Sequence, residues 1–237
     1  MKYDFKIKIF ADGAEADKMK AQYKDGIVSG FTTNPSLIKK AGVKDYKAFA
    51  KNIVENIPDL PISFEVFADD LNTMEKEAKV ISGLGKNVFV KIPSMTTKYE
   101  STVPLVKKLT DDGIKVNITT VMTDSQVESF IKNVNPNTPC FLSIFAGRIA
   151  DTGADPMPIV KKAVDMSRDN KNLMVLWAST REFYNIIEAE KLGVDAITVP
   201  DSVLAKFKNY GRDLNELSHD AVTAFSNDIK SLNMSIL

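Results

Sequence analysis

One lysine of this sequence lies inside a short apolar run, where its amine could act as a nucleophile. Lys91 falls within residues 88–93, and the other five residues of that run are apolar. Such a run predicts a buried strand, and burial favours a neutral lysine amine over the charged ammonium. A neutral amine can form a Schiff base with a carbonyl substrate. The alternative is a structural lysine that reaches water or pairs with a carboxylate.

The composition narrows the possible functions. The 31 basic and 31 acidic residues cancel, so neither nucleic acid nor an anionic membrane is expected as a partner. The only cysteine, Cys140, excludes an internal disulfide and a multi-cysteine metal site. The only histidine, His219, lies in a polar stretch, which leaves acid–base chemistry to carboxylates, lysine or tyrosine. With neither a signal peptide nor a run of membrane-spanning length, we expect a cytoplasmic protein.

Apolar runs alternate with segments of helical period along the whole chain. Helices are expected at 71–84, 99–111 and 182–192. Strands are expected at 5–10, 27–31, 62–67, 87–92, 114–118, 139–145, 173–177 and 195–199. Eight such units predict an α/β fold, a (β/α)8 TIM barrel that forms a single domain over 1–237. A doubly wound open sheet is the main rival, but its glycine-rich dinucleotide fingerprint is absent.

A helical extension is predicted after the last strand, at 211–235. Its apolar positions recur at helical spacing, at Leu214, Leu217, Ala221, Phe225, Ile229 and Leu232. This stripe either packs on the chain's own barrel or reaches a neighbouring subunit.

Polar side chains occur at the ends of successive predicted strands. They are Asp12, Thr33, Asn34, Glu65, Lys91, Asn117, Thr119, Ser143, Ser179 and Arg181. The carboxyl ends of barrel strands meet at one mouth, where barrel enzymes place their active sites. The joint occurrence of these residues therefore predicts a site there.

Each of these positions also has a structural interpretation. Asp12 could cap a helix that begins near Ala14, and Ser179 or Thr180 could cap the next helix. Residues 32–35 could be a turn with proline at the first helical position. Glu65 could simply pair with Lys91.

A phosphate site is predicted late in the chain. Arg148 follows the sixth strand, and Arg181 opens the helix after the seventh. Two guanidinium groups beside a helix amino terminus suit a phosphate dianion. Alternatively, Arg148 pairs with Asp151 and Arg181 pairs with Glu182.

Taken together, these motifs resemble the transaldolase family, in particular its short single-barrel members, which include the fructose-6-phosphate aldolases. The Thr-Thr-Asn-Pro-Ser-Leu block at 32–37 and the Val-Lys-Ile-Pro block at 90–93 are the most specific. The other matching segments are 10–14, 64–66, 116–119, 126, 143–151 and 178–181.

The resemblance implies a role for each position. Lys91 would be the Schiff-base lysine, Asp12 the general base, and Glu65 with Thr119 would hold a proton-shuttling water. The remaining residues would bind a sugar phosphate substrate. The dihydroxyacetone part would contact Asn34, Asn117 and Ser143, with Thr33 and Phe145 beside them, and the phosphate would contact Arg148, Ser179 and Arg181.

The resemblance further implies a transaldolase of the pentose phosphate pathway that needs neither metal nor cofactor, because the iminium ion itself withdraws electrons. Glu65 and Phe145 favour transfer, since family aldolases usually carry glutamine and tyrosine at these positions. Gly13, Thr180 and the loop 94–100 depart from the family pattern. An aldolase that releases free dihydroxyacetone is the first alternative, and a non-catalytic sugar-phosphate-binding barrel is the second. A homo-oligomer is expected, with a pentamer or a decamer as the candidate ring sizes.

Overall fold

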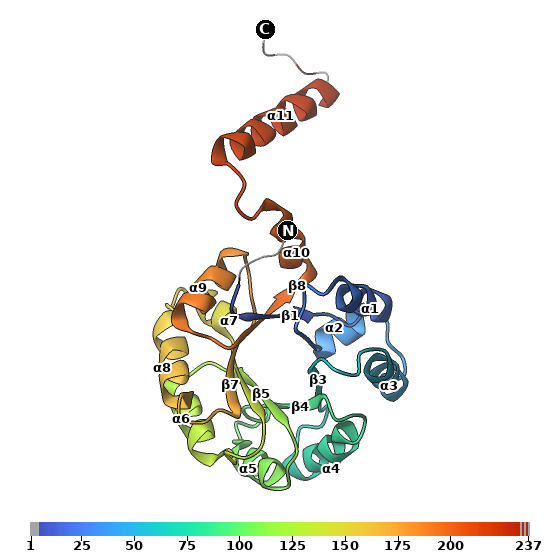
Figure 1. Cartoon of the computed structure of the whole chain (residues 1–237), viewed down its shortest axis with the longest axis vertical. Helices are drawn as coiled ribbons and strands as arrows, with labels where there is room; N and C mark the ends of the chain where they lie inside the picture. Colours follow the sequence, from blue (N-terminus) through green and yellow to red (C-terminus); the bar gives the residue numbers. More distant parts are fainter. Residues whose placement is uncertain (1–4, 233, 235, 237) are drawn as a thin grey trace. The chain divides into compact units, whose positions relative to one another are not determined.

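Eight parallel strands pair in chain order and close into a barrel, as a computed structural model that describes residues 5–232, 234 and 236 shows (Figure 1). The predicted (β/α)8 barrel is confirmed. The strands are β1 (Lys8–Asp12), β2 (Gly30–Thr32), β3 (Ile62–Glu65), β4 (Val88–Pro93), β5 (Val116–Val121), β6 (Cys140–Ile144), β7 (Leu173–Trp177) and β8 (Ala196–Pro200). β1 lies further along the chain than the predicted 5–10, because Asp12 still pairs with Thr32 on β2 and Pro200 on β8.

A layer of helices surrounds the barrel (Figure 1). The helices of the barrel unit are α1 (Ala16–Asp25), α2 (Pro35–Lys40), α3 (Tyr46–Asn56), α4 (Leu71–Ser82), α5 (Val103–Asp111), α6 (Asp124–Asn133), α7 (Ala146–Ala150), α8 (Met157–Ser167), α9 (Tyr184–Leu192) and α10 (Asp201–Leu204). The helix predicted to begin at residue 99 begins about one turn later, at Val103. Before it, Met95 and Ser101 form a β-bridge that closes a loop. Tyr99 in this loop has φ 63°, which no helix tolerates.

Inside the barrel, a layer of apolar side chains lies below a layer of polar side chains. One buried cluster contains Phe10, Phe89 and Phe141. The rings of Phe10 and Phe141 meet edge to face, with 5.4 Å between their centres. Gly30 leaves room for the Phe10 ring of this apolar layer, since a Cβ at position 30 would come within 2.7 Å of that ring. Side chains alternate in a strand, so the residues two positions after these phenylalanines also face inward. Those residues are Asp12, Lys91 and Ser143.

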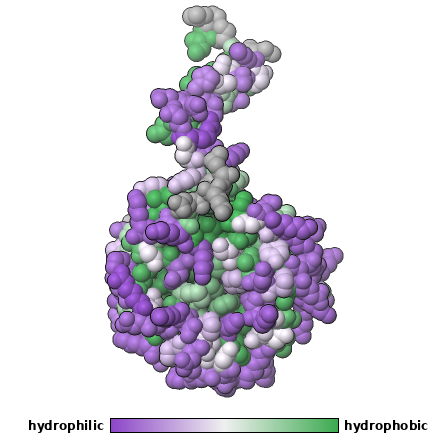
Figure 2. All heavy atoms as spheres, viewed as in Figure 1, coloured by the Kyte–Doolittle hydropathy of each residue, from purple (hydrophilic) through white to green (hydrophobic). Residues whose placement is uncertain are grey.

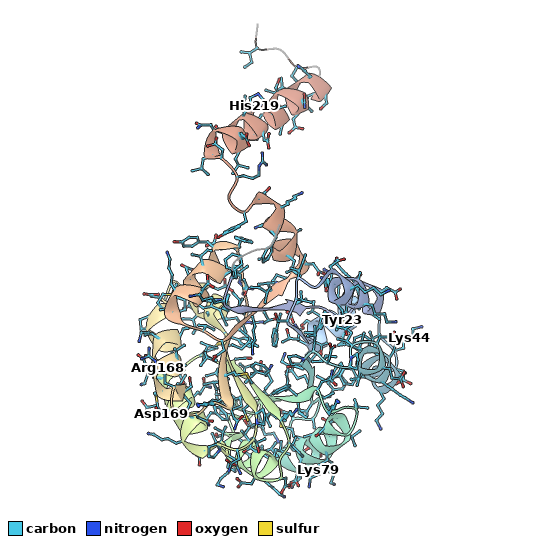
Figure 3. All side chains as sticks on the ribbon, viewed as in Figure 1. Tyr23, Lys44, Lys79, Arg168, Asp169 and His219 are labelled. Atoms are coloured by element: carbon cyan, nitrogen blue, oxygen red, sulfur yellow. The ribbon has the colours of Figure 1, made fainter. Side chains whose placement is uncertain are left out.

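Outside, the barrel unit is covered by hydrophilic side chains. Figure 2 shows them over the rim that the helices form. Lys79, Arg168 and Asp169 are exposed and point outward from this rim (Figure 3). No helix among the described residues is long and apolar enough to cross a membrane.

The chain forms two compact units, Met1–Leu204 and Ala205–Leu237. The second unit holds the short helix η1 (Ala205–Asn209), which precedes the predicted extension at 211–235, and the long helix α11 (Leu214–Leu232), which lies within it. Positions 233 and 235 of that extension lie outside the described residues. Every residue of α11 is exposed, including Phe225 at 67 % and Ile229 at 59 %.

Candidate active site

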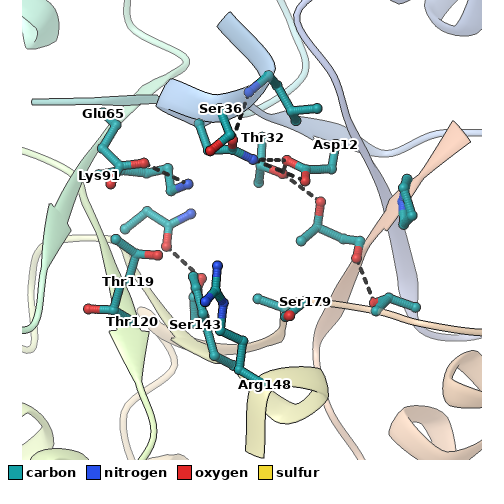
Figure 4. Close-up of a pocket in the computed structure, with 18 of the residues that line it drawn as sticks. Asp12, Thr32, Ser36, Glu65, Lys91, Thr119, Thr120, Ser143, Arg148 and Ser179 are labelled. Atoms are coloured by element: carbon teal, nitrogen blue, oxygen red, sulfur yellow. Dashed lines mark hydrogen bonds and ion pairs between the residues drawn. The ribbon is translucent and has the colours of Figure 1, made fainter. Parts of the chain in front are cut away.

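A pocket of about 440 Å³ opens at the carboxyl ends of the strands. Every residue predicted for the site lines it except Thr33. The residues of the pocket that the sequence predicted are Asp12, Asn34, Glu65, Lys91, Asn117, Thr119, Ser143, Phe145, Arg148, Ser179 and Arg181. Figure 4 shows Asp12, Lys91 and Arg148 pointing into this opening from different elements. The structure thus gathers residues that are up to 169 positions apart in the sequence (181 minus 12).

Lys91 is buried, with 6 % of its surface exposed, and its amine faces the pocket. The Nζ atom donates to the carbonyl oxygen of Thr33 at 2.7 Å and lies 3.1 Å from Oε2 of Glu65. This ion pair follows from the sheet register, in which Glu65 on β3 is the direct partner of Lys91 on β4. The interpretation of Lys91 as a lysine that reaches bulk water is therefore wrong. The interpretation that it pairs with a carboxylate is confirmed, and the partner is Glu65 inside the pocket.

Thr33 contributes its backbone to the site. Its hydroxyl is fully buried and donates to the carbonyl oxygen of Ser63 at 3.0 Å, away from the pocket. Its own carbonyl oxygen accepts from Lys91. Thr33 therefore holds the lysine amine, and its side chain does not occupy the substrate-binding position that the resemblance implies.

Asp12, at the end of β1, is bound by neighbours on β2 and the turn that follows. Its carboxylate accepts from Oγ1 of Thr32 at 2.8 Å and from Nδ2 of Asn34 at 3.3 Å. Burial raises the pKa of Asp12, while the nearby Lys91 charge and the Thr32 hydrogen bond oppose that rise. The helix cap interpretation is wrong, because α1 begins after Glu15 and Asp12 lies outside its first turn.

Asn34 serves the fold and the site together. Its Oδ1 accepts from the N–H of Leu37 at 3.0 Å and caps α2, with Pro35 at the first helical position as the turn interpretation expected. Capping fixes the orientation of the amide, so its Nδ2 points at Asp12. The same side chain thereby links the start of α2 to the carboxylate.

Asn117 and Ser143 form a buried chain of hydrogen bonds across three strands. Ser143 Oγ donates to Asn117 Oδ1 at 2.6 Å, and Asn117 Nδ2 donates to Ser63 Oγ at 2.9 Å. Each group fixes the rotamer of the next, so the polar edge that they present to the pocket is rigid.

Thr119 presents a hydroxyl that has no hydrogen-bond partner among the described residues, although the side chain is buried. It lies where β5 shifts register between Ile118 and Val121. The next residue, Thr120, has φ 61°, an unusual angle for a β-branched residue, and its Oγ1 accepts from the N–H of Ser94 at 3.0 Å. Thr119 also lines the pocket, so its unpaired hydroxyl lies at the pocket wall.

The two arginines differ in their contacts. Arg148 is exposed on α7 and lines the pocket, and its predicted alternative pairing with Asp151 is not among the ion pairs of the described residues. Arg181 pairs with Asp151 through two hydrogen bonds and does not pair with Glu182 as the alternative proposed. These bonds, and to a smaller extent the charges of both arginines, hold the pKa of Asp151 below its usual value. Asp151 thus fixes the plane of the Arg181 guanidinium beside the pocket.

Ser179 reaches the pocket because its loop lies tightly against α7. A Cβ on Gly147 would come within 1.7 Å of the Ser179 carbonyl oxygen, so only glycine fits there. Ser179 itself has φ 64°. Neither it nor Thr180 caps a helix, since α9 follows Phe183 without a side-chain cap, and Thr180 donates to the carbonyl of Thr198 at 2.7 Å.

Sequence reasoning missed three hydroxyl residues on the inner face of the barrel. Thr32 contacts Asp12 and also Thr198, whose Oγ1 lies 2.5 Å from its own, and Ser63 holds Asn117. The signal was the two-residue alternation of a strand, since Ser63 precedes Glu65 by two positions. No group of three or more His, Cys, Asp or Glu side chains that could hold a metal ion occurs among the described residues.

Comparison with known proteins decides the family. A family model described as Transaldolase/Fructose-6-phosphate aldolase matches residues 9–236. The chain belongs to this family. The transaldolase resemblance predicted from the motifs is confirmed.

Relatives within the transaldolase/fructose-6-phosphate aldolase family carry consistent names. A "Probable transaldolase" of Methanococcus maripaludis is 37 % identical over 205 residues, which cover 86 % of this chain and 91 % of that protein. A "Probable transaldolase" of a Ruegeria species is 34 % identical over 233 residues and covers 98 % of this chain and 100 % of its own. The similarity therefore extends over nearly the whole chain, as expected for members of one enzyme family.

A solved structure supports the fold alone. The crystal structure of KGPDC from Streptococcus mutans, determined as a complex, aligns with a TM-score of 0.53 at 12 % identity. The alignment covers 82 % of this chain and 88 % of that one. At this identity, the likeness extends to the barrel architecture and to nothing finer.

Proposed function

We propose that the protein is a transaldolase that transfers a dihydroxyacetone unit from a ketose phosphate to an aldose phosphate through a Schiff base on Lys91. One observation carries the proposal. The Lys91 amine is buried, lies 3.1 Å from Glu65 and faces a pocket that Asp12 also lines. Class I aldol chemistry requires a nucleophile, a carboxylate close to it and a second carboxylate in the same pocket.

Lys91 and Glu65 would form the Schiff base together. Transfer of one Nζ proton to Glu65 frees the amine to add to the C2 ketone, and the carbinolamine loses water to give an iminium ion. Glu65 is close enough to take a proton from Nζ directly or through one water. The unpaired Thr119 hydroxyl supports a role for that residue in holding this water.

Asp12 would break the carbon–carbon bond. It takes the proton of the C4 hydroxyl, the C3–C4 bond cleaves, and its electron pair moves to the iminium nitrogen to form an enamine. An aldose phosphate leaves as the free aldehyde. The enamine then attacks the acceptor aldehyde, whose oxygen takes the proton back from Asp12 and becomes the new C4 hydroxyl, and hydrolysis of the new iminium releases the product ketose and free Lys91. The raised pKa of Asp12 supports this role, because it makes the carboxylate a stronger base.

Substrate would be bound by the rest of the pocket. The rigid Asn117–Ser143 pair and Asn34 suit the hydroxyls of the dihydroxyacetone part. Arg148, Ser179 and Arg181 lie together at the pocket and suit a phosphate dianion. Phe145 in place of a tyrosine offers no hydroxyl to the enamine, which supports transfer over release.

The exchange reaction tests this function. With fructose 6-phosphate as donor and erythrose 4-phosphate as acceptor, we expect sedoheptulose 7-phosphate and glyceraldehyde 3-phosphate in equal amounts. Unphosphorylated fructose should be a poorer donor by about tenfold or more, since charge-assisted hydrogen bonds to the phosphate would be lost. Product analysis by mass spectrometry measures both.

Omission of the acceptor provides the decisive control. A transaldolase should then stop after one turnover per site, with the enamine bound. Stoichiometric release of free dihydroxyacetone in that reaction would instead indicate the aldolase. Tight binding of fructose 6-phosphate without any turnover would indicate a non-catalytic binding protein.

We also propose that the protein is a homo-oligomer in which α11 packs against another copy of the chain. The exposed stripe that includes Leu217, Phe225 and Ile229 supports this, because such an apolar face is unfavourable in water. Phe225→Glu is expected to lower the particle mass toward the 26.2 kDa of one chain. Light scattering after gel filtration measures it.

Asn227→Glu is the matched control for assembly. It places the same charge on the same helix, about 200° around the axis from Phe225. We expect this variant to keep the wild-type mass. Equal masses for wild type and Phe225→Glu would show that the stripe does not drive assembly.

A further inference from the structure

Tyr46 makes an unusual contact at the end of β3. Its hydroxyl accepts from the backbone N–H of Glu65 at 3.0 Å and donates to the carbonyl oxygen of the same residue at 3.2 Å. We propose that Tyr46 is a positioning residue for Lys91, because its hydroxyl replaces β2 as the partner of Glu65 and leaves the Thr33 carbonyl to the lysine amine. The inference rests on the proposed Schiff-base function, and neither the motifs nor the pocket lining pointed to this residue.

The hydrogen-bond ladder between β2 and β3 supplies the argument. In a parallel pair, the bonds alternate between the strands at steps of two residues. Phe31 donates to Pro61 at 2.9 Å and Thr33 donates to Ser63 at 3.1 Å, so the next bond in the series would run from Glu65 N–H to Thr33 O. That oxygen instead accepts from Lys91 at 2.7 Å. The ladder is thus interrupted at the point where the catalytic amine enters.

The following bond of the ladder is missing as well. It would run from residue 35 to the carbonyl oxygen of Glu65, but Pro35 has no N–H to donate. Both backbone groups of Glu65 therefore lose their β2 partners. A single tyrosine hydroxyl can satisfy both, since it is a donor and an acceptor at once.

The surroundings of Tyr46 hold this hydroxyl in place. Tyr46 is the first residue of α3. The centre of its ring lies 4.5 Å from that of the Phe67 ring and 6.1 Å from that of the Phe64 ring, which it meets edge to face. Burial raises the pKa of Tyr46 far above neutral pH, so the hydroxyl keeps the proton that it donates. Phenylalanine in its place would retain the ring contacts and remove only the hydroxyl.

Loss of the hydroxyl should place two donors in competition for one oxygen. Without it, the Glu65 N–H would have no partner, and the ladder geometry directs it to Thr33 O. Lys91 would then lose the acceptor that fixes its Nζ, and Glu65 would move relative to it. The amine would be less well placed to attack the ketone, although the substrate-binding groups would be untouched.

Tyr46→Phe tests this inference. We expect kcat to fall about tenfold with KM for fructose 6-phosphate unchanged within about twofold, as a small displacement of a reacting group predicts. The rate at which borohydride traps the substrate on Lys91 should fall by the same factor. Tyr23→Phe is the matched control, because the Tyr23 hydroxyl is exposed and contacts only Asp59 at 2.7 Å among the described residues.

The wild-type protein separates this inference from the proposed function. If wild type forms no trapped adduct on Lys91, the proposed function fails. If wild type is trapped and Tyr46→Phe matches it in kcat and trapping rate, the positioning role fails alone. A rise in KM without a change in kcat, or a Tyr46→Phe protein that does not fold, would also overturn it, because the hydroxyl would then serve binding or the fold.

Discussion

Lys91→Met is expected to abolish turnover, with kcat reduced about 10⁴-fold or more, because removal of a covalent nucleophile leaves no alternative route to the enamine. Methionine is close to lysine in length but has no amine. Borohydride with fructose 6-phosphate should add the mass of the reduced adduct to the wild-type chain and nothing to the variant. Intact-mass spectrometry followed by peptide mapping measures this at residue 91.

Lys115→Met is the matched control for Lys91. The Lys115 side chain is half-buried, and its amine donates to the carbonyl oxygen of Lys86 at 2.6 Å and lies 5.6 Å from the centre of the Phe89 ring, outside the pocket. This variant should keep its turnover and its trapped adduct. An adduct that persists in Lys91→Met would show that another amine is the nucleophile.

The stability of Lys91→Met reports on the ion pair that is lost. Glu65 would remain partly buried without its cation, which destabilises a fold more than removal of both charges does. We therefore expect a lower free energy of unfolding for Lys91→Met than for Lys91→Met combined with Glu65→Gln. Circular dichroism during urea unfolding provides both values and shows that the inactive variant is folded.

The barrel and the identity of its central amine were predictable from sequence for a physical reason. Parallel strands are buried on both faces and appear as apolar runs, so a charged residue within one of them stands out. Lys91 is such a residue, and the alternation of side chains places it on the same inner face as Phe89. These features depend on neighbours along the chain, which sequence displays directly.

Contacts between distant segments were not predictable in the same way. Arg181 pairs with Asp151, which is 30 positions away, in preference to the adjacent Glu182. Thr33 turns its hydroxyl to Ser63 and offers Lys91 its carbonyl instead. Which partner a side chain takes depends on how the loops pack, as Gly147 packs against the Ser179 carbonyl. The local sequence does not indicate this packing.

Asp12→Asn is expected to lower kcat about 10³-fold, because asparagine cannot accept the proton of the C4 hydroxyl. Substrate binding and Schiff-base formation should persist, since the new amide has nearly the same shape and its oxygen, in the place of Oδ1, would keep the Thr32 hydrogen bond. Borohydride should therefore still trap the donor on Lys91. Steady-state kinetics together with trapping distinguishes loss of cleavage from loss of the first step.

The pH dependence provides a second readout for Asp12. The carboxylate must be ionised to act as a base, so wild-type kcat should fall as pH decreases through its pKa. Because burial raises that pKa, activity should be lost at a higher pH than for an ordinary carboxyl. The residual activity of Asp12→Asn should lack this acid limb.

Stability should change in the opposite direction from activity. A carboxyl whose pKa is raised by folding favours the unfolded chain once pH exceeds its ordinary value of 3.8, because the unfolded carboxyl ionises more easily. Asp12→Asn should therefore unfold at a higher urea concentration than wild type at pH 7. The difference should vanish below about pH 3.8, where the carboxyl is protonated in both states.

Asp195→Asn is the matched control for both effects. Asp195 precedes β8 at the other end of the barrel, accepts from the N–H of Val175 at 2.8 Å, and also has a pKa raised by burial. Its replacement should change stability without reducing kcat, since it does not line the pocket. If Asp12→Asn lost stability at pH 7 along with activity, its effect would be structural, and the assignment of Asp12 as the base would be wrong.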